Sequence, residues 1–243
     1  MIKKTLPADL TSYDILKTVA VLLMIADHVG YYFFPGEEGW RIAGRFCVPI
    51  WFFLIGYAHS RDIGWKLWAG IGVICLANLG LGLDMLPVTI LLTIMIVRLV
   101  LDPLMILLAG DRGLIWPLTV CLAILALPSG VVIEYGTMGL VLAMAGYLLR
   151  HEPGADRTLL YIGLTGICFI IYQGLVFQFS TPGMGFFMLG TTAVMALLYY
   201  FRPQTYPSVG RKSAFLIQLC GRHTLVIYVL HLLLFKILYT MSI

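Results

Sequence analysis

Apolar segments long enough to cross a membrane run along almost the whole chain of 243 residues. A transmembrane helix needs about 20 predominantly apolar residues, and fewer where neighbouring helices shield its ends. A backbone in lipid must satisfy its own hydrogen bonds, so these segments are expected to be helices. The sequence therefore predicts an all-α fold, a polytopic integral-membrane bundle of about nine transmembrane helices. The segments are residues 14–34, 42–59, 66–83, 87–108, 114–127, 135–149, 159–179, 184–201 and 224–239.

The composition is that of a protein with most of its mass in lipid, because 60% of its residues are hydrophobic and only 12% are charged. This balance excludes an ordinary soluble domain. The net charge of +4 is modest, so no nucleic-acid partner is expected. The five cysteines are odd in number and lack CxxC spacing, so neither disulfides nor a metal site is expected. Nothing in the sequence divides the chain, and residues 1–243 are predicted to form one integral-membrane domain.

Basic residues are distributed unevenly between the loops on the two sides of the predicted membrane. The loops on one side hold only Arg41 and Arg45. The N-terminus and the loops on the other side hold Lys3, Lys4, Arg61, Lys66, Arg112, Arg150, Arg157, Arg202, Arg211, Lys212 and Arg222. Cytoplasmic loops carry an excess of Lys and Arg, so the N-terminus is predicted to be cytoplasmic and the C-terminus to lie outside.

The first segment carries a lysine, an aspartate and a histidine at membrane depth. Lys17 and His28 are eleven residues apart, which places them about 20° apart around a helix and about 16 Å apart along it. Ionisable groups inside a membrane usually mark a pathway or a reaction centre. We therefore expect Lys17 and His28 to share one functional face, with Lys17 nearer the cytoplasm and His28 nearer the outside.

Asp27 precedes His28, so the two side chains point about 100° apart and a dyad within this helix is not expected. Asp27 is instead predicted to meet Arg41 or Arg45 at the start of the second segment. That contact would be either an ion pair that joins two helices or a part of the reaction centre. His231, in the ninth segment, is predicted to lie at a depth close to that of His28. Each histidine is either a functional group or a core residue with satisfied hydrogen bonds.

Two further groups of polar residues have simple structural interpretations. Arg98 and Asp102 are four residues apart in the fourth segment and are expected to neutralise each other. Glu134 and Tyr135 open the sixth segment, and a carboxylate at that position is expected to cap its own helix.

Four stretches of the sequence occur in the order found in a known family of membrane proteins. They are DILKTVAVLLMIADH (Asp14–His28), AGRFCVPIWFFLIGY (Ala43–Tyr57), EYGTMGL (Glu134–Leu140) and IYVLHLLLF (Ile227–Phe235). Together they resemble the TraX family, which includes an F-pilin N-acetylase. The first and last also resemble the wider class of integral-membrane acyltransferases that modify bacterial surface glycans. In that class a basic residue, ten others and a histidine lie in the first span, as Lys17 and His28 do here.

The resemblance implies transfer of an acetyl group from cytoplasmic acetyl-CoA to an acceptor at the outer side of a bacterial inner membrane. The acceptor it favours is the N-terminal amine of a pilin subunit, and a hydroxyl of a surface glycan or lipid is the alternative. The catalytic residues that it implies are His28, as the base, with Asp27, His231 and Tyr135. The residues expected to contact the donor are Lys17, Arg45, Arg98 and Arg222.

Two other classes of function fit some of these features. A proton-coupled transporter would also use histidine, aspartate and arginine inside the membrane, but such proteins usually contain repeated halves and broken helices. A non-catalytic scaffold or pilus assembly factor would not need a titratable histidine on one face with a lysine. We therefore expect an acyltransferase in preference to either.

Overall fold

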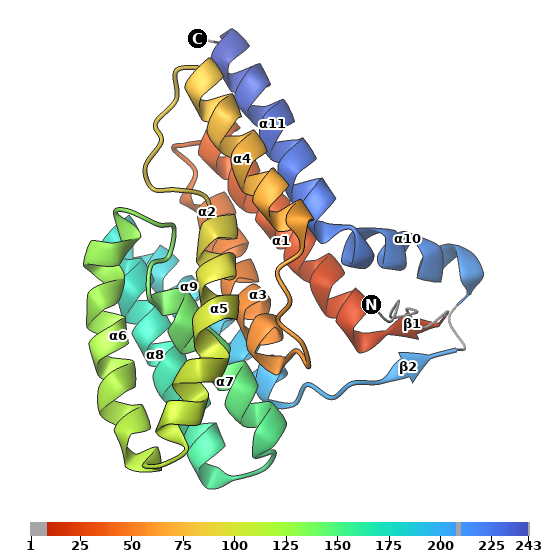
Figure 1. The fold of residues 1–243 in the computed structure, drawn as a ribbon. Coiled ribbons are helices and arrows are strands. Elements are labelled where there is room, and N and C mark those ends of the chain that lie inside the picture. Colours follow the sequence, from red (N-terminus) through yellow and green to blue (C-terminus); the bar gives the residue numbers. More distant parts are fainter. Residues whose placement is uncertain (1–8, 208–209, 243) are drawn as a thin grey trace.

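The computed structural model describes residues 9–207 and 210–242 of the chain, and this part is almost entirely helical (Figure 1). Lys3 and Lys4, which contributed to the predicted orientation, lie outside the described residues. The helices are α1 (Ser12–Phe33), α2 (Glu38–Arg45), α3 (Cys47–Tyr57), α4 (Trp65–Gly80), α5 (Ile90–Leu108), η1 (Arg112–Leu114), α6 (Ile115–Gly130), α7 (Met138–His151), α8 (Asp156–Phe177), α9 (Thr181–Tyr199), α10 (Arg211–Arg222) and α11 (Thr224–Ser242). Two short strands, β1 (Leu10–Thr11) and β2 (Thr205–Tyr206), pair in antiparallel fashion.

Six helical stretches in the described residues are long and apolar enough to cross a membrane. They are Ser12–Phe33, Ile90–Leu108, Arg112–Gly130, Asp156–Phe177, Thr181–Tyr199 and Thr224–Ser242. The helices α4 and α7 are apolar but shorter. The chain is thus a multi-pass helical membrane protein, as the sequence predicts. The count of nine spans and the cytoplasmic N-terminus stay predictions.

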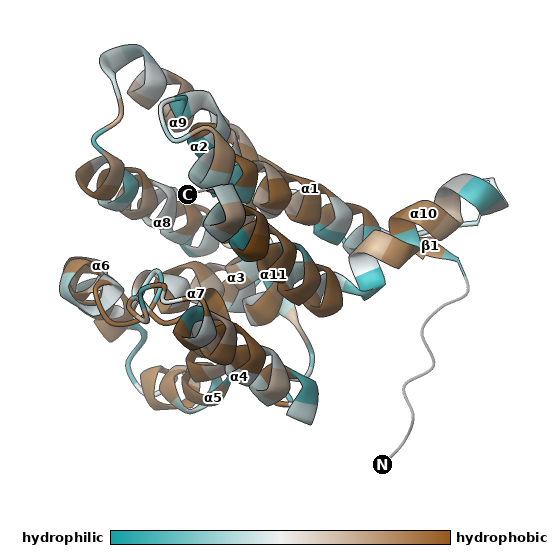
Figure 2. Ribbon diagram, turned by 90° about the horizontal axis from the view of Figure 1, so that it is seen from above, coloured by the Kyte–Doolittle hydropathy of each residue, from teal (hydrophilic) through white to brown (hydrophobic). Residues whose placement is uncertain are grey.

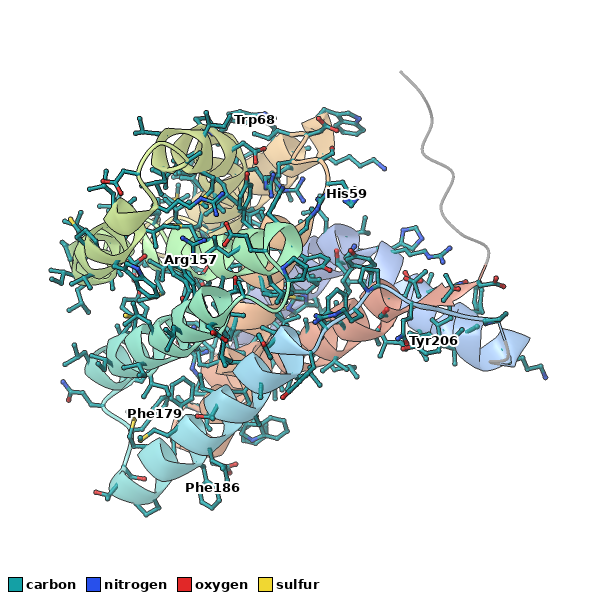
Figure 3. The ribbon with its side chains drawn as sticks, turned by 90° about the horizontal axis from the view of Figure 1, so that it is seen from below. His59, Trp68, Arg157, Phe179, Phe186 and Tyr206 are labelled. Atoms are coloured by element: carbon teal, nitrogen blue, oxygen red, sulfur yellow. The ribbon has the colours of Figure 1, made fainter. Side chains whose placement is uncertain are left out.

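The outside of the bundle is apolar, as a surface in contact with lipid requires. Figure 2 shows apolar residues along most of the length of the helices. Large hydrophobic side chains stand on the outside, among them Trp68, which is 57% exposed, and Phe186, which is 69% exposed (Figure 3). In water such a surface would drive aggregation, whereas in a bilayer it faces lipid acyl chains, which are equally apolar.

The second predicted span is divided into two helices, α2 and α3, which meet at Phe46. Pro49, in the first turn of α3, has no backbone N–H, so the carbonyl of Arg45 lacks its usual partner four residues on. This proline accounts for the interruption. It leaves α2 free to pack against the C-terminal half of α1, where the arginines of α2 meet Asp27.

The centre of the bundle is the contact between α3 and α7, both of which are buried along nearly all of their length. Glycine allows the two backbones to approach closely. A side chain at Gly56 would collide with the carbonyl of Ala143, and one at Gly146 would collide with the carbonyl of Phe53. Small residues serve this purpose between membrane helices, where packing rather than the hydrophobic effect holds helices together.

The remaining helices form two groups around this centre (Figure 1). On one side α11 packs against α1 and α4, and α10 packs against α1 near its N-terminal end. On the other side α6 and α8 pack against α7, and α9 packs against α8 and α3. The two groups leave a cavity between α1, α3, α4, α5 and α11, and this cavity contains the candidate site.

Candidate functional site

A cavity of about 970 Å³ opens at the N-terminal end of α1 and extends into the bundle. Its two ends differ in chemistry. At the end called here the mouth, the lining includes the basic side chains of Lys17, His59, Arg61, Lys66 and Arg98. At the deep end it includes Asp27, His28, Glu134, Tyr135 and Tyr228. Apolar side chains from α3, α4 and α5 line the stretch between the two ends.

The predicted common face of Lys17 and His28 is confirmed, because both side chains line this cavity. About 16 Å of α1 separates them along the helix axis. Capping explains where the helix begins: the Thr11 side chain accepts a hydrogen bond from Asp14 N, and the Asp14 side chain accepts one from Thr11 N. This capping box fixes the start of α1 and thereby the depth of both residues.

The histidines of α1 and α11 form a hydrogen-bonded pair at the deep end. His28 Nδ1 lies 2.7 Å from His231 Nε2, and His231 Nδ1 lies 2.7 Å from the carbonyl oxygen of Ile227. A carbonyl only accepts, so His231 Nδ1 carries a hydrogen, and in the neutral ring Nε2 is then the acceptor. It follows that His28 Nδ1 donates to His231, and that His28 Nε2 is left with a free lone pair. His28 lines the cavity and His231 does not.

Asp27 pairs with both arginines of α2, as the sequence predicts. Its Oδ2 lies 3.1 Å from Arg41 Nη1 and 3.1 Å from Arg45 Nη2. Asp27 is 6% exposed and Arg45 is 5% exposed, so this is a buried ion pair between two helices. Arg45 does not line the cavity. It lies behind the wall, by which we mean the residues that line the cavity. Its guanidinium is 4.4 Å from the centre of the Phe177 ring, and its Nη1 donates to the Tyr135 hydroxyl.

The short helix α2, which carries both arginines, is attached at its first residue to the beginning of α9. Glu38 Oε2 accepts a hydrogen bond of 3.0 Å from Ser180 N, and the Ser180 hydroxyl donates to Glu38 Oε1. These two hydrogen bonds lower the pKa of the Glu38 carboxyl, because they favour its charged form. Glu38 therefore holds α2, and with it Arg45, in position.

Tyr135 does not open a helix, so that prediction is wrong. The helix α7 begins at Met138, and Tyr135 lies in the turn before it with a φ of +66°. A left-handed conformation at a residue other than glycine costs about 1–3 kcal/mol and is often found at functional sites. Gly136, at φ +48°, continues the turn, and a side chain there would collide with Ser129. The turn directs the tyrosine ring into the cavity wall beside Arg45.

Glu134 does not cap its own helix, so that prediction is also wrong. Its Oε2 accepts a hydrogen bond of 2.9 Å from Ile90 N, at the beginning of α5. The residue lines the deep end of the cavity next to Tyr135. Sequence reasoning missed it as a site residue, because its partner lies 44 positions away and no local pattern indicates this contact.

The arginines at the mouth are also arranged differently from the prediction. Asp102 pairs with Arg61, not with Arg98. Arg98 Nη1 instead donates to the carbonyl of Asp62 at 2.9 Å. The side chains of Arg98 and Arg61 both line the cavity, and the Nε atoms of both are buried without a hydrogen-bond partner among the described residues.

Arg222 was predicted to contact the donor, but its side chain is not part of the cavity lining. It forms an ion pair with Asp14, with Nη2 3.0 Å from Oδ2 and Nε 3.1 Å from Oδ1. It thus ties α10 to the beginning of α1. In its place the structure brings His59, Arg61 and Lys66 to the mouth. The prediction from the sequence had considered Arg61 and Lys66 only as basic loop residues that indicate orientation.

Comparison with known proteins identifies the family. A family model described as TraX protein matches residues 12–239, which is nearly the whole chain. A stretch of 48 residues is 46% identical to an uncharacterized protein of Rickettsia prowazekii (strain Madrid E) and covers 19% of each chain, so the match spans about a fifth of that relative. No solved structure matches the chain. The extent of the family match shows that this protein belongs to the TraX family.

Proposed function

We propose that this protein is a membrane acetyltransferase. In this proposal it moves an acetyl group from cytoplasmic acetyl-CoA to an acceptor at the outer side of the bacterial inner membrane. The observation that carries the proposal is the cavity, which is basic at its mouth and has a histidine with a free lone pair at its deep end. Membership of the TraX family fits a pilin-associated function in conjugation. The proposed acceptor is accordingly the N-terminal amine of a pilin subunit.

The mouth fits the anionic part of the donor. Lys17, Arg61, Lys66 and Arg98 place four cationic side chains around one opening. Guanidinium and ammonium groups bind phosphate through charge and hydrogen bonds. Two of these cations, Arg61 and Arg98, are guanidinium groups, which bind phosphate with several N–H donors at once.

The middle of the cavity fits the pantetheine arm. Its lining is apolar and includes Trp51, Leu54 and Ile94. The distance from Lys17 to His28 is about 16 Å along α1, which an extended pantetheine arm spans. A volume of about 970 Å³ lies near the upper limit of the range usual for small-molecule sites, about 300–1,000 Å³.

The deep end supplies the chemistry of acyl transfer. His28 Nε2 takes a proton from the acceptor as the acceptor attacks the thioester carbonyl. The bond from His28 Nδ1 to His231 holds the ring in the required tautomer, and it strengthens when His28 becomes positively charged. Arg45 donates to the oxygen of Tyr135, so the hydroxyl hydrogen of Tyr135 is free to bind the developing oxyanion.

The test uses purified protein in lipid nanodiscs, acetyl-CoA labelled in the acetyl group, and a peptide with a free N-terminal amine. We expect saturable binding of the donor and transfer of the label to the peptide. The same peptide with its N-terminus already acetylated is the control and should receive no label. Absence of both binding and transfer would contradict the proposal and favour a transporter or a scaffold.

A further inference from the structure

Glu134 is the one carboxylate at the deep end that is not already used by an arginine. Its Oε2 is occupied by Ile90 N, whereas its Oε1 forms no hydrogen bond among the described residues and is not sealed from the cavity. We propose that Glu134 is a second catalytic residue, which accepts a hydrogen bond from the ammonium group of the acceptor and removes one of its protons. This inference rests on the proposed acetyltransferase function.

The lining of the deep end suits the docking of an ammonium group. Besides Glu134 its lining includes the aromatic residues Tyr135 and Tyr228, and aromatic rings attract cations at their faces. The nearest arginines lie behind the wall. Arg41 and Arg45 are both directed at Asp27, and neither is part of the lining. A ligand at this end therefore meets a carboxylate oxygen and aromatic faces before it meets a fixed cation.

The charges around Glu134 favour loss of the proton once the ammonium is docked. The charged groups close enough to act on Glu134 are Arg41 and Arg45 from α2, Asp27 from α1 and Lys236 from α11. The other titratable groups near it are Tyr32, Cys47, Tyr135, Tyr172 and Tyr228. This set holds three cations and one carboxylate, and Glu134 itself is the second carboxylate. Such surroundings disfavour a further positive charge and thus favour the neutral, nucleophilic amine.

An amine acceptor has two protons to lose, and the deep end then has one base for each. First, a proton passes from R–NH₃⁺ to the Glu134 carboxylate, which gives R–NH₂ and the carboxylic acid. Next, the amine nitrogen forms a bond to the thioester carbon while His28 Nε2 takes the second proton. The carbon–sulfur bond then breaks, the CoA thiolate leaves with its electron pair, and the proton on His28 converts the thiolate to the thiol. The proton on Glu134 leaves to water with the product, so the net release is one proton.

The substitution Glu134→Gln tests this role, because the amide oxygen can still accept from Ile90 N while the base is removed. We would measure kcat/KM for an amine peptide from pH 6 to pH 9.5 and take the ratio of variant to wild-type protein. A variant that uses only the neutral amine should show a ratio that falls about tenfold per pH unit below the amine pKa of about 7.7–8.0. The ratio should approach one above pH 9. Changes in His28 ionisation cancel in this ratio.

Two further variants separate this role from a structural one. Glu134→Asp keeps a carboxylate, so the ratio of its kcat/KM to that of the wild type should not change with pH, even if the variant is slower. Glu37→Gln removes an exposed carboxylate outside the cavity and should match the wild type at every pH. A Glu134→Gln ratio that is constant with pH, or equally steep ratios for Gln and Asp, would overturn the proposal. Wild-type protein that binds no acetyl-CoA and transfers no acetyl group would overturn the proposed function itself, and this inference with it.

Discussion

The two ends of the cavity hold their charges in different ways. At the mouth, Lys66 is exposed and Lys17 is half-buried, and neither has an ion-pair partner within 4 Å among the described residues. At the deep end, Asp27 and Arg45 are buried and bound to each other across two helices. Water reaches the mouth, so Lys17 and Lys66 can stay unpaired until a ligand arrives, whereas Arg61 is paired with Asp102. Far from water an unpaired charge is too costly, and charges there must be neutralised by another helix.

This difference indicates which atoms each end can offer to a substrate. The mouth offers charged side chains, which can bind a ligand through their full positive charge. The deep end offers a few selected atoms, His28 Nε2, the Tyr135 hydroxyl and Glu134 Oε1, and the arginine that binds Tyr135 is not part of the lining. Variants at the deep end should therefore affect chemistry or folding, and variants at the mouth should affect donor binding.

The largest effect is expected for His28→Gln. Removal of the base should lower the rate of acetyl transfer by about 10²–10⁴-fold, with little change in acetyl-CoA binding, because the mouth is untouched. Binding is measured by isothermal titration in nanodiscs and transfer by the label on the peptide. Cys121→Ser, which changes an exposed residue outside the cavity, is the control. Full transfer activity in His28→Gln would remove His28 from the mechanism.

A second large effect is expected for Asp27→Asn, and it concerns stability. The substitution leaves Arg41 and Arg45 facing each other without a carboxylate, and breaking a buried ion pair in this way costs about 3–5 kcal/mol. The apparent melting temperature in detergent should fall clearly. Asp102→Asn removes a carboxylate that is half-exposed, although the side chain of its partner Arg61 is buried, and should lower the melting temperature far less. Equal losses for the two variants would contradict the contrast between the ends.

A smaller effect is expected for His231→Ala, which removes the orienting partner of His28. Loss of the ring position and tautomer should lower kcat by about 10²-fold and leave KM for acetyl-CoA nearly unchanged. His231→Gln keeps groups that can accept from His28 and donate to the Ile227 carbonyl, so it should recover part of kcat. If Ala and Gln behave alike, the hydrogen-bonded chain does not matter for the reaction.

The smallest effect is expected at the mouth, for Lys17→Met. One cation of four is lost, so KM for acetyl-CoA should rise by about tenfold, which corresponds to about 1.4 kcal/mol, while kcat changes little. The rise should shrink at high salt, since screening weakens the interaction in the wild type as well. Arg202→Gln, which removes a cation outside the cavity, is the matched control. A fall in kcat with unchanged KM would place Lys17 in the chemistry instead of donor binding.

Helical periodicity was sufficient for predictions that concern a single helix. Lys17 and His28 share a face because 100° per residue repeats nearly in register after eleven steps. The same geometry separated Asp27 from His28 and directed it toward the arginines of the second segment, where the structure places it. Composition was sufficient for the class, a multi-pass helical membrane protein.

Predictions failed where a polar residue chose a distant partner over a near one. Arg98 and Asp102 have ideal spacing for a pair within one helix, yet Asp102 pairs with Arg61 from the loop between α3 and α4. Glu134 has the position of a cap for α7, yet it caps α5. In each case the local partner was adequate in isolation, and packing brought another donor closer. The contact of His28 with His231 joins residues 203 positions apart, and only their similar depth hinted at it.

The sequence by itself determined that this protein is a helical membrane protein with a lysine and a histidine on one face of its first helix. It also carried the resemblance to the TraX family, which the family match confirms. The tertiary structure decided which charges line the cavity and which lie behind its wall. The physical reason is that periodicity fixes directions within one helix, whereas the partner of a buried charge depends on which helices pack together, and that depends on the whole fold.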